Sequence, residues 1–146
     1  MAVLQPNAAA VVDACLSGDE AAALAAAAAL PEDQGYLNYP SSKRALARWV
    51  RREAPTDAWA GRGIPLNAVA PSVVLTAMTK DLVNNDEGRA LLERSVPMPL
   101  GGYATAEDVA WPILWLLSPE NKKVTGQLLF VDGGTDAVLR GDNLWE

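Results

Sequence analysis

The sequence contains no histidine and a single cysteine, Cys15, among its 146 residues. Without an imidazole the chain cannot build a Ser-His-Asp or Cys-His arrangement, and it lacks the commonest protein ligand of metal ions. One thiol supports neither an intrachain disulfide nor a zinc cluster, which favours a reducing, cytoplasmic location and predicts no metal site. General acid–base chemistry therefore has to come from tyrosine, lysine, aspartate or glutamate.

Long hydrophobic runs are also absent. The longest, residues 21–30, is about half of the roughly 20 residues that a membrane-spanning helix needs. Acidic residues interrupt the region that follows Met1, so we expect no signal peptide. The formal net charge of -6 would repel phosphate backbones and anionic lipid surfaces. These features predict a protein with neither a nucleic-acid partner nor a membrane partner.

Hydrophobic patterning predicts an α/β chain. Residues 1–38 are rich in alanine and predict a helical segment, and the spacing of Leu46, Trp49 and Val50 predicts an amphipathic helix over residues 39–59. The apolar segments 64–70 and 127–131 predict buried strands. One or two helices are expected within 76–94, and a further one follows a capping-box pattern at Thr105.

Strands separated by long helical stretches indicate a parallel sheet. Two strands are too few for a stable parallel sheet, because such sheets are covered on both faces and need neighbours. The sequence therefore predicts that residues 1–146 form only part of a Rossmann-like domain.

Tyr39 and Lys43 lie four residues apart at the start of a predicted helix, so their side chains project from the same face. An ammonium group near a phenol favours the phenolate and lowers its pKa, which would allow the tyrosine to donate or accept a proton. The spacing by itself is a weak indicator of function, since it also occurs by chance on helices.

Further motifs follow this pair in a fixed order. They are Tyr39-Pro-Ser-Ser-Lys43-Arg-Ala-Leu46, Asn67-Ala-Val-Ala-Pro71-Ser72-Val-Val74-Leu-Thr76, Ala106-Glu-Asp-Val-Ala110, and Thr125-Gly126 through Val131-Asp-Gly-Gly134. Together they resemble the short-chain dehydrogenase/reductase family. The segment 132–140 and the long stretch before Tyr39 look most like its 3-alpha-hydroxysteroid dehydrogenase/carbonyl reductase branch.

The resemblance implies a doubly wound parallel sheet and an NAD- or NADP-dependent hydride transfer between an alcohol and a carbonyl, with hydroxysteroids among the candidate substrates. It implies that Tyr39 is the acid–base residue and that Lys43 binds the nicotinamide ribose. Pro71, Val74 and Thr76 would form the loop beside the nicotinamide, although Pro71 could simply end a strand and Thr76 could simply cap a helix. Residues 76–94 would be the substrate lid. The full-length form would be a homo-oligomer.

The sequence also departs from the family pattern. No Gly-x-x-x-Gly-x-Gly occurs among its eleven glycines, so the phosphate-binding loop of the family has no counterpart. The family's catalytic serine has no counterpart either, because its usual distance before the tyrosine places it near Ala26 or before Met1. Ser72 replaces a usual glycine, and Gly102 a frequent arginine.

Two interpretations follow from these departures. In the first, the chain is the C-terminal part of an oxidoreductase that lacks the cofactor-binding half, with residues 39–146 as the catalytic and C-terminal part, and it is inactive in isolation. In the second, it is a non-catalytic truncated paralogue that acts as an oligomerisation or interaction module. An unrelated α/β domain with accidental motif matches is a third alternative.

Overall fold

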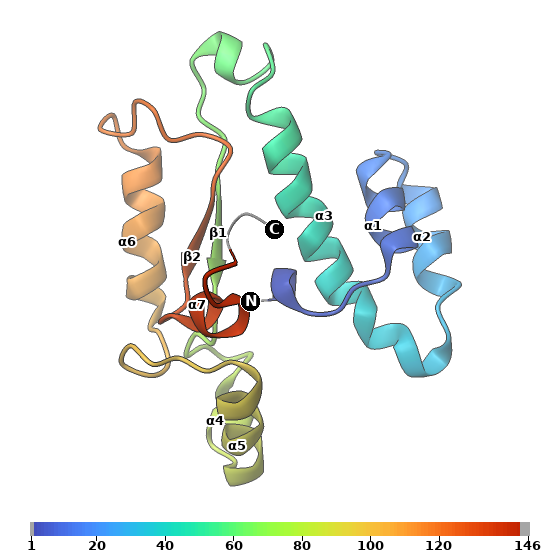
Figure 1. Cartoon of the computed structure of the whole chain (residues 1–146), viewed down its shortest axis with the longest axis vertical. Coiled ribbons are helices and arrows are strands. Elements are labelled where there is room, and N and C mark those ends of the chain that lie inside the picture. Colours follow the sequence, from blue (N-terminus) through green and yellow to red (C-terminus); the bar gives the residue numbers. More distant parts are fainter. Residues whose placement is uncertain (1, 144–146) are drawn as a thin grey trace. The chain divides into compact units, whose positions relative to one another are not determined.

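A computed structural model describes residues 2–143, which form two compact units (Figure 1). The first unit, the helical unit, consists of Ala2–Ala68 and Thr125–Gln127. The second, the α/β unit, consists of Val69–Val124 and the chain from Leu128 onward. None of the described helices combines the length and the apolar character that crossing a bilayer requires.

The helical unit is built around α1 (Ala9–Leu16), which packs against both α2 (Glu20–Ala28) and α3 (Asn38–Glu53). Short 3-10 helices cover Ala2–Leu4, Glu32–Leu37 and Ala60–Arg62. The core of the unit contains Val11 and Val12 of α1 and Ala45 and Val50 of α3, all at most 4% exposed. The predicted helical segment before Tyr39 is therefore present as α1 and α2.

The buried face of α3 differs from the predicted one. Of the three apolar residues used to predict it, only Val50 is buried, whereas Leu46 is 49% and Trp49 38% exposed. The small residues Ser41 and Ala45 are buried instead. Small side chains let α1 approach α3 closely, and a periodicity of large apolar residues does not detect such a face. The helix also ends at Glu53, before the predicted end at residue 59.

Two strands form the sheet of the α/β unit: β1 (Ala68–Pro71) and β2 (Leu128–Val131). The Ala68 N–H donates to the Gln127 carbonyl at 2.9 Å and the Ser72 N–H to the Val131 carbonyl at 3.3 Å. From the first bond to the second, both strands advance by four residues in the same direction, as strands of a parallel pair do. The predicted parallel α/β architecture is thus confirmed, although β1 begins four residues later than the predicted strand.

The α/β unit also contains the helices α4 (Lys80–Val83), α5 (Asp86–Ser95), α6 (Ala106–Leu117) and α7 (Thr135–Arg140). Helix α6 contacts β2, and α4 contacts α5. Two helices therefore occupy the predicted 76–94 region.

The predicted capping box opens α6. The Thr105 hydroxyl oxygen accepts from the Asp108 N–H at 3.2 Å, and the Asp108 carboxylate accepts from the Thr105 N–H at 2.7 Å and from the Thr105 hydroxyl at 2.8 Å. The bond from the Thr105 N–H has the largest effect on the Asp108 carboxylate, and the bond from the Thr105 hydroxyl the next largest. Both hold the pKa of Asp108 below its ordinary value. The start of the helix is therefore set by local contacts.

A glycine turn follows β2. Gly133 and Gly134 have φ angles of +62° and +93°, in the left-handed region that favours glycine. The buried Thr135 hydroxyl then donates to the carbonyls of Pro97 at 2.7 Å and Asp132 at 2.9 Å. The bond to Pro97 connects the chain after β2 to the segment that precedes α6.

Candidate active site

Tyr39 and Lys43 lie on the first turns of α3, and the Lys43 Nζ is 5.4 Å from the centre of the Tyr39 ring. Both residues are exposed, Tyr39 by 62%. The ammonium group and the phenol therefore lie together on one helix face, as the four-residue spacing predicts, and both can be reached by a ligand.

The backbone below this pair is fixed by Ser41, which points from the opposite face of the helix. Its hydroxyl donates to the Leu37 carbonyl at 2.6 Å and accepts from the Ala8 N–H at 2.9 Å, and its side chain is fully buried. Ser41 thus anchors the start of α3 to the segment before α1, which places Tyr39 and Lys43 on a fixed stretch of helix.

The loop predicted to lie beside the nicotinamide follows β1. Pro71 is the last residue of that strand, and Val74 forms a parallel bridge with Ala104. The Leu75 N–H donates to the Ala104 carbonyl at 2.8 Å, and the Ala104 N–H donates to the Val73 carbonyl at 3.0 Å. The loop is therefore held extended past the carboxyl end of β1, where open α/β sheets bind their ligands.

Thr79 is a residue of this loop that sequence reasoning missed. Its hydroxyl donates to the Val74 carbonyl at 2.5 Å and accepts from the Thr76 N–H at 3.0 Å. The side-chain oxygens of Thr76 and Thr79 are 3.5 Å apart. Thr79 thus fixes the main chain of the loop at Val74 and Thr76, the two residues whose main-chain or hydroxyl groups the resemblance assigns to the cofactor. The Thr-x-x-Thr spacing was the only sequence signal available for it.

Space is present next to these groups. A cavity of about 220 Å³ lies between the loop and α4 and is lined by Leu75, Thr76, Ala77, Thr79, Lys80, Val83 and Asn84. Ser72, where the family usually has glycine, is engaged elsewhere, because its hydroxyl donates to the Met98 thioether at 2.9 Å. Gly102, where the family often has arginine, is exposed and has a φ of +80°.

Each unit separately offers groups that suit part of a nicotinamide nucleotide. In the helical unit, a phenol and an ammonium group suit a ribose, and in the α/β unit, main-chain groups and a hydroxyl suit a carboxamide. The 146 residues contain no glycine-rich loop that would hold the pyrophosphate. Tyr39 and Lys43 belong to the helical unit, and Pro71, Val74 and Thr76 to the α/β unit.

The parallel α/β fold and the order of these motifs are similar to those of nicotinamide-dependent oxidoreductases. The family model described as "Enoyl-(Acyl carrier protein) reductase" matches residues 9–136. The chain therefore belongs to the short-chain dehydrogenase/reductase family, as predicted.

Several relatives are similar over most of this chain. The 3-alpha-hydroxysteroid dehydrogenase/carbonyl reductase of Comamonas testosteroni is 35% identical over 124 residues, which are 85% of this chain and 47% of the relative. The crystal structure of the 3-alpha-hydroxysteroid dehydrogenase from Pseudomonas sp. B-0831 complexed with NADH has a TM-score of 0.83 at 38% identity, covering 99% of this chain and 56% of that one. These two matches confirm the predicted likeness to the hydroxysteroid branch.

A third relative contains the other form of the cofactor. It is the crystal structure of a protein from Beutenbergia cavernae, described as an NAD(P)-dependent gluconate 5-dehydrogenase, with bound NADP; it has a TM-score of 0.59 at 40% identity and matches 69% of this chain and 39% of that one. Of these two solved relatives, one thus contains NADH and the other NADP. The chain spans about half the length of the relatives it matches, or less.

Proposed function

We propose that this chain supplies the proton-transfer residues of an NAD(P)-dependent alcohol/carbonyl oxidoreductase. The observation that carries the proposal is the juxtaposition of Lys43 Nζ and the Tyr39 ring at 5.4 Å on an exposed helix face. Neither histidine nor a cysteine pair is present to take over the proton chemistry.

In this mechanism the nicotinamide cofactor, when bound, supplies or accepts the hydride. Tyr39 gives a proton to the carbonyl oxygen of the substrate during reduction, or takes it from the alcohol during oxidation. Lys43 would donate hydrogen bonds to the ribose hydroxyls of the cofactor. Pro71, Val74 and Thr76 would hold the nicotinamide end of the cofactor, on a loop whose main chain Thr79 fixes at Val74 and Thr76.

We further propose that the 146-residue chain has no turnover by itself and acts with a cofactor-binding half that precedes it in a complete oxidoreductase. The absence of a glycine-rich phosphate loop and of the family's serine before Tyr39 supports this proposal. Hydroxysteroids are the first substrates to test, because two similar relatives are named as hydroxysteroid dehydrogenases. Cytoplasmic location and homo-oligomeric assembly of the complete enzyme belong to the same proposal.

A chimera tests the proposal. The N-terminal half of the Comamonas relative would be joined to this chain and assayed with NADH or NADPH and a series of ketosteroids and small ketones. We expect Tyr39→Phe to lower kcat at least about 100-fold, the lower range for general acid–base catalysis, and Lys43→Met to raise the KM for cofactor. Tyr36→Phe is the matched control, since Tyr36 is an exposed tyrosine three residues away.

Two results would contradict the proposal. Retained turnover in the Tyr39→Phe chimera would remove Tyr39 from the proton transfer. Saturable NADH binding by the 146-residue chain alone, at one molecule per chain in a fluorescence titration, would show that a phosphate site has been overlooked.

A specific observation also favours the second candidate function, an oligomerisation or interaction module. From Val109 to its end at Leu117, helix α6 contains apolar residues on every side, as helices covered on several sides do. Val109, Pro112 and Leu116 are its least exposed apolar residues, whereas Trp111, Leu114 and Leu117 are 70%, 55% and 78% exposed.

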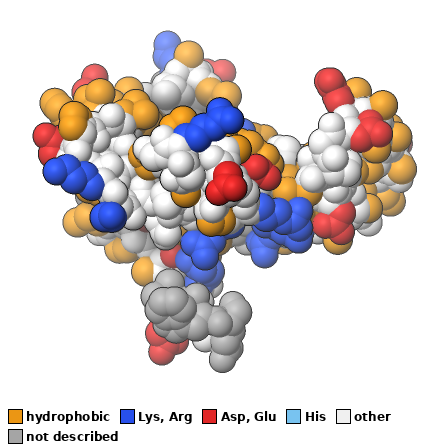
Figure 2. All heavy atoms as spheres, turned by 90° about the horizontal axis from the view of Figure 1, so that it is seen from above, with side chains coloured by type: hydrophobic (Ala, Val, Ile, Leu, Met, Phe, Trp, Pro, Cys, Tyr) orange, Lys and Arg blue, Asp and Glu red, His pale blue; other side chains and the backbone are white. Residues whose placement is uncertain are grey.

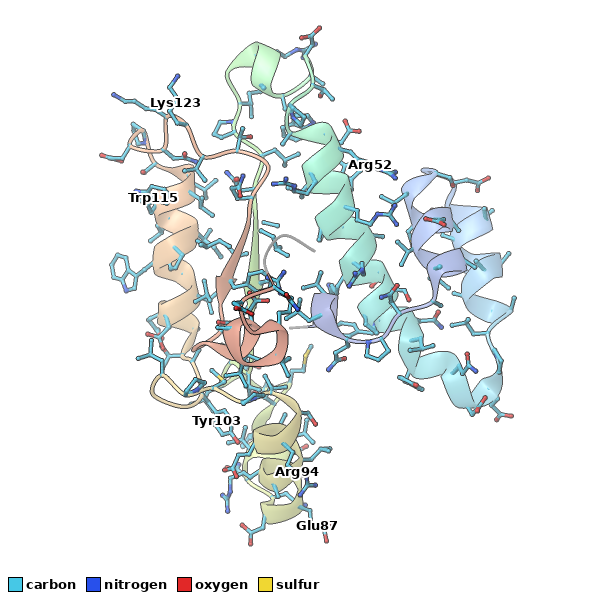
Figure 3. The ribbon with its side chains drawn as sticks, viewed as in Figure 1. Arg52, Glu87, Arg94, Tyr103, Trp115 and Lys123 are labelled. Atoms are coloured by element: carbon cyan, nitrogen blue, oxygen red, sulfur yellow. The ribbon has the colours of Figure 1, made fainter. Side chains whose placement is uncertain are left out.

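Figure 3 shows that Trp115 also projects from this helix, and Figure 2 shows hydrophobic side chains on the molecular surface. Sedimentation velocity tests this function. Self-association that weakens in Trp111→Ser would support it, and a monomer at all concentrations would count against self-association.

A further inference from the structure

A second, larger cavity lies within the α/β unit, apart from the residues assigned to hydride transfer. Its volume is about 470 Å³, which lies within the range of small-molecule sites. Its apolar wall is formed by Val96, Pro97, Met98, Pro99 and Val138. Arg89 and Glu93 of α5, both exposed, add charged groups to the lining.

The wall of this cavity is fixed by hydrogen bonds to the rest of the unit. The Pro97 carbonyl accepts from the buried Thr135 hydroxyl at 2.7 Å, and the Met98 thioether accepts from the Ser72 hydroxyl at 2.9 Å. The Leu100 N–H donates to the Gly133 carbonyl at 2.9 Å. The segment that lines the cavity is therefore held in place, which is a property of sites formed before their ligand arrives.

Tyr103, labelled in Figure 3, lies in the loop between α5 and α6 and also lines this cavity. Its hydroxyl is shielded from solvent and has no hydrogen-bond partner among the described residues. A buried hydroxyl without a partner has lost its hydrogen bonds to water and makes none to the protein, which costs free energy.

We infer that this cavity binds a small, mainly apolar molecule with one hydrogen-bonding group, and that the Tyr103 hydroxyl pairs with that group. The apolar wall accounts for the body of the molecule, and the unpaired hydroxyl accounts for its polar end. The cavity shares Arg89 and Glu93 with the predicted substrate lid, but Tyr39, Lys43, Pro71, Val74 and Thr76 do not line it, so the inference does not rest on the residues proposed for hydride transfer.

A pair of probes that differ only in the polar group tests this inference. 2-Naphthol and naphthalene would be titrated into the isotopically labelled 146-residue chain and followed by the shifts of its amide signals. We expect 2-naphthol to bind more tightly and to shift signals of residues 96–103 and of Val138. Tyr103→Phe should weaken 2-naphthol binding about threefold to tenfold, the equivalent of one hydrogen bond, and leave naphthalene binding unchanged.

Two further variants complete the design. Tyr36→Phe, which removes an exposed tyrosine hydroxyl in the helical unit, should bind both probes as the unaltered chain does. Val138→Trp, at a half-exposed position of the lining, should fill the cavity and abolish the binding of both.

Without ligand, Tyr103→Phe should melt at the same temperature or higher, because the hydroxyl that it removes has no partner. Equal 2-naphthol affinity in Tyr103→Phe and the unaltered chain would overturn the inference. So would signal shifts confined to other residues, or a lower melting temperature of Tyr103→Phe.

Discussion

Gly88 allows α5 to lie close to α4, and its replacement by alanine is expected to destabilise this pair of helices. Gly88 is buried within α5, and a Cβ atom placed there would lie 2.4 Å from the Leu82 carbonyl oxygen and 3.0 Å from its carbon. These are backbone atoms, which cannot rotate away as the end of a side chain can. Ordinary contact begins at 3.4 Å, so α4 and α5 would have to separate by about 1 Å.

The magnitude follows from two opposing effects. Replacing a helical glycine by alanine normally stabilises by about 1 kcal/mol, whereas overpacking of a close contact costs about 1–3 kcal/mol. Because the overlap at Gly88 is severe, we expect Gly88→Ala to lose a net ~1–2 kcal/mol of local stability. Native-state hydrogen exchange would show this loss as an increase of about tenfold in the exchange rates of the α5 amides.

Gly35→Ala is the matched control. Gly35 has no atom within 4 Å of the added Cβ and no positive φ, so its replacement should be neutral or slightly stabilising. Exchange rates of the α5 amides that stay unchanged or fall in Gly88→Ala, as expected near residue 35 for Gly35→Ala, would contradict the reasoning. The contact between Gly88 and Leu82 would then not restrict the packing of the two helices.

Two more predictions concern the α/β unit. Thr135→Val keeps the shape of a fully buried side chain but leaves the Pro97 carbonyl without its donor, so we expect a loss of about 1–3 kcal/mol in a urea titration; an unchanged midpoint would contradict this. For Asp108, hydrogen bonds from the Thr105 N–H and hydroxyl hold the pKa below its ordinary value of 3.8. Its contribution to stability is therefore present above that pH and disappears as the pH falls through the lower folded-state pKa. Asp108→Asn should make stability depend less steeply on pH in this acidic range, and identical pH profiles of the two proteins would show that the cap does not act through this charge.

Sequence alone determined the features that depend on short-range interactions. The capping box of Thr105 and Asp108 joins groups three residues apart, and the approach of Lys43 to the Tyr39 ring follows from the helical repeat. The glycine turn after β2 requires positive φ angles that glycine adopts readily. The family was recognisable for the same reason, because its motifs are short and their order is visible in the chain.

Tertiary structure alone decided the features that depend on contacts between distant segments. The face of α3 that is buried against α1 contains Ser41 and Ala45, because close helix packing selects small residues. The course of the loop after β1 is set by the distant Ala104 segment, which forms a parallel bridge with Val74. The cavity beside Tyr103 needs α5, the loop after it and α7 together. No local pattern specifies these contacts, since each depends on how the chain closes over long separations.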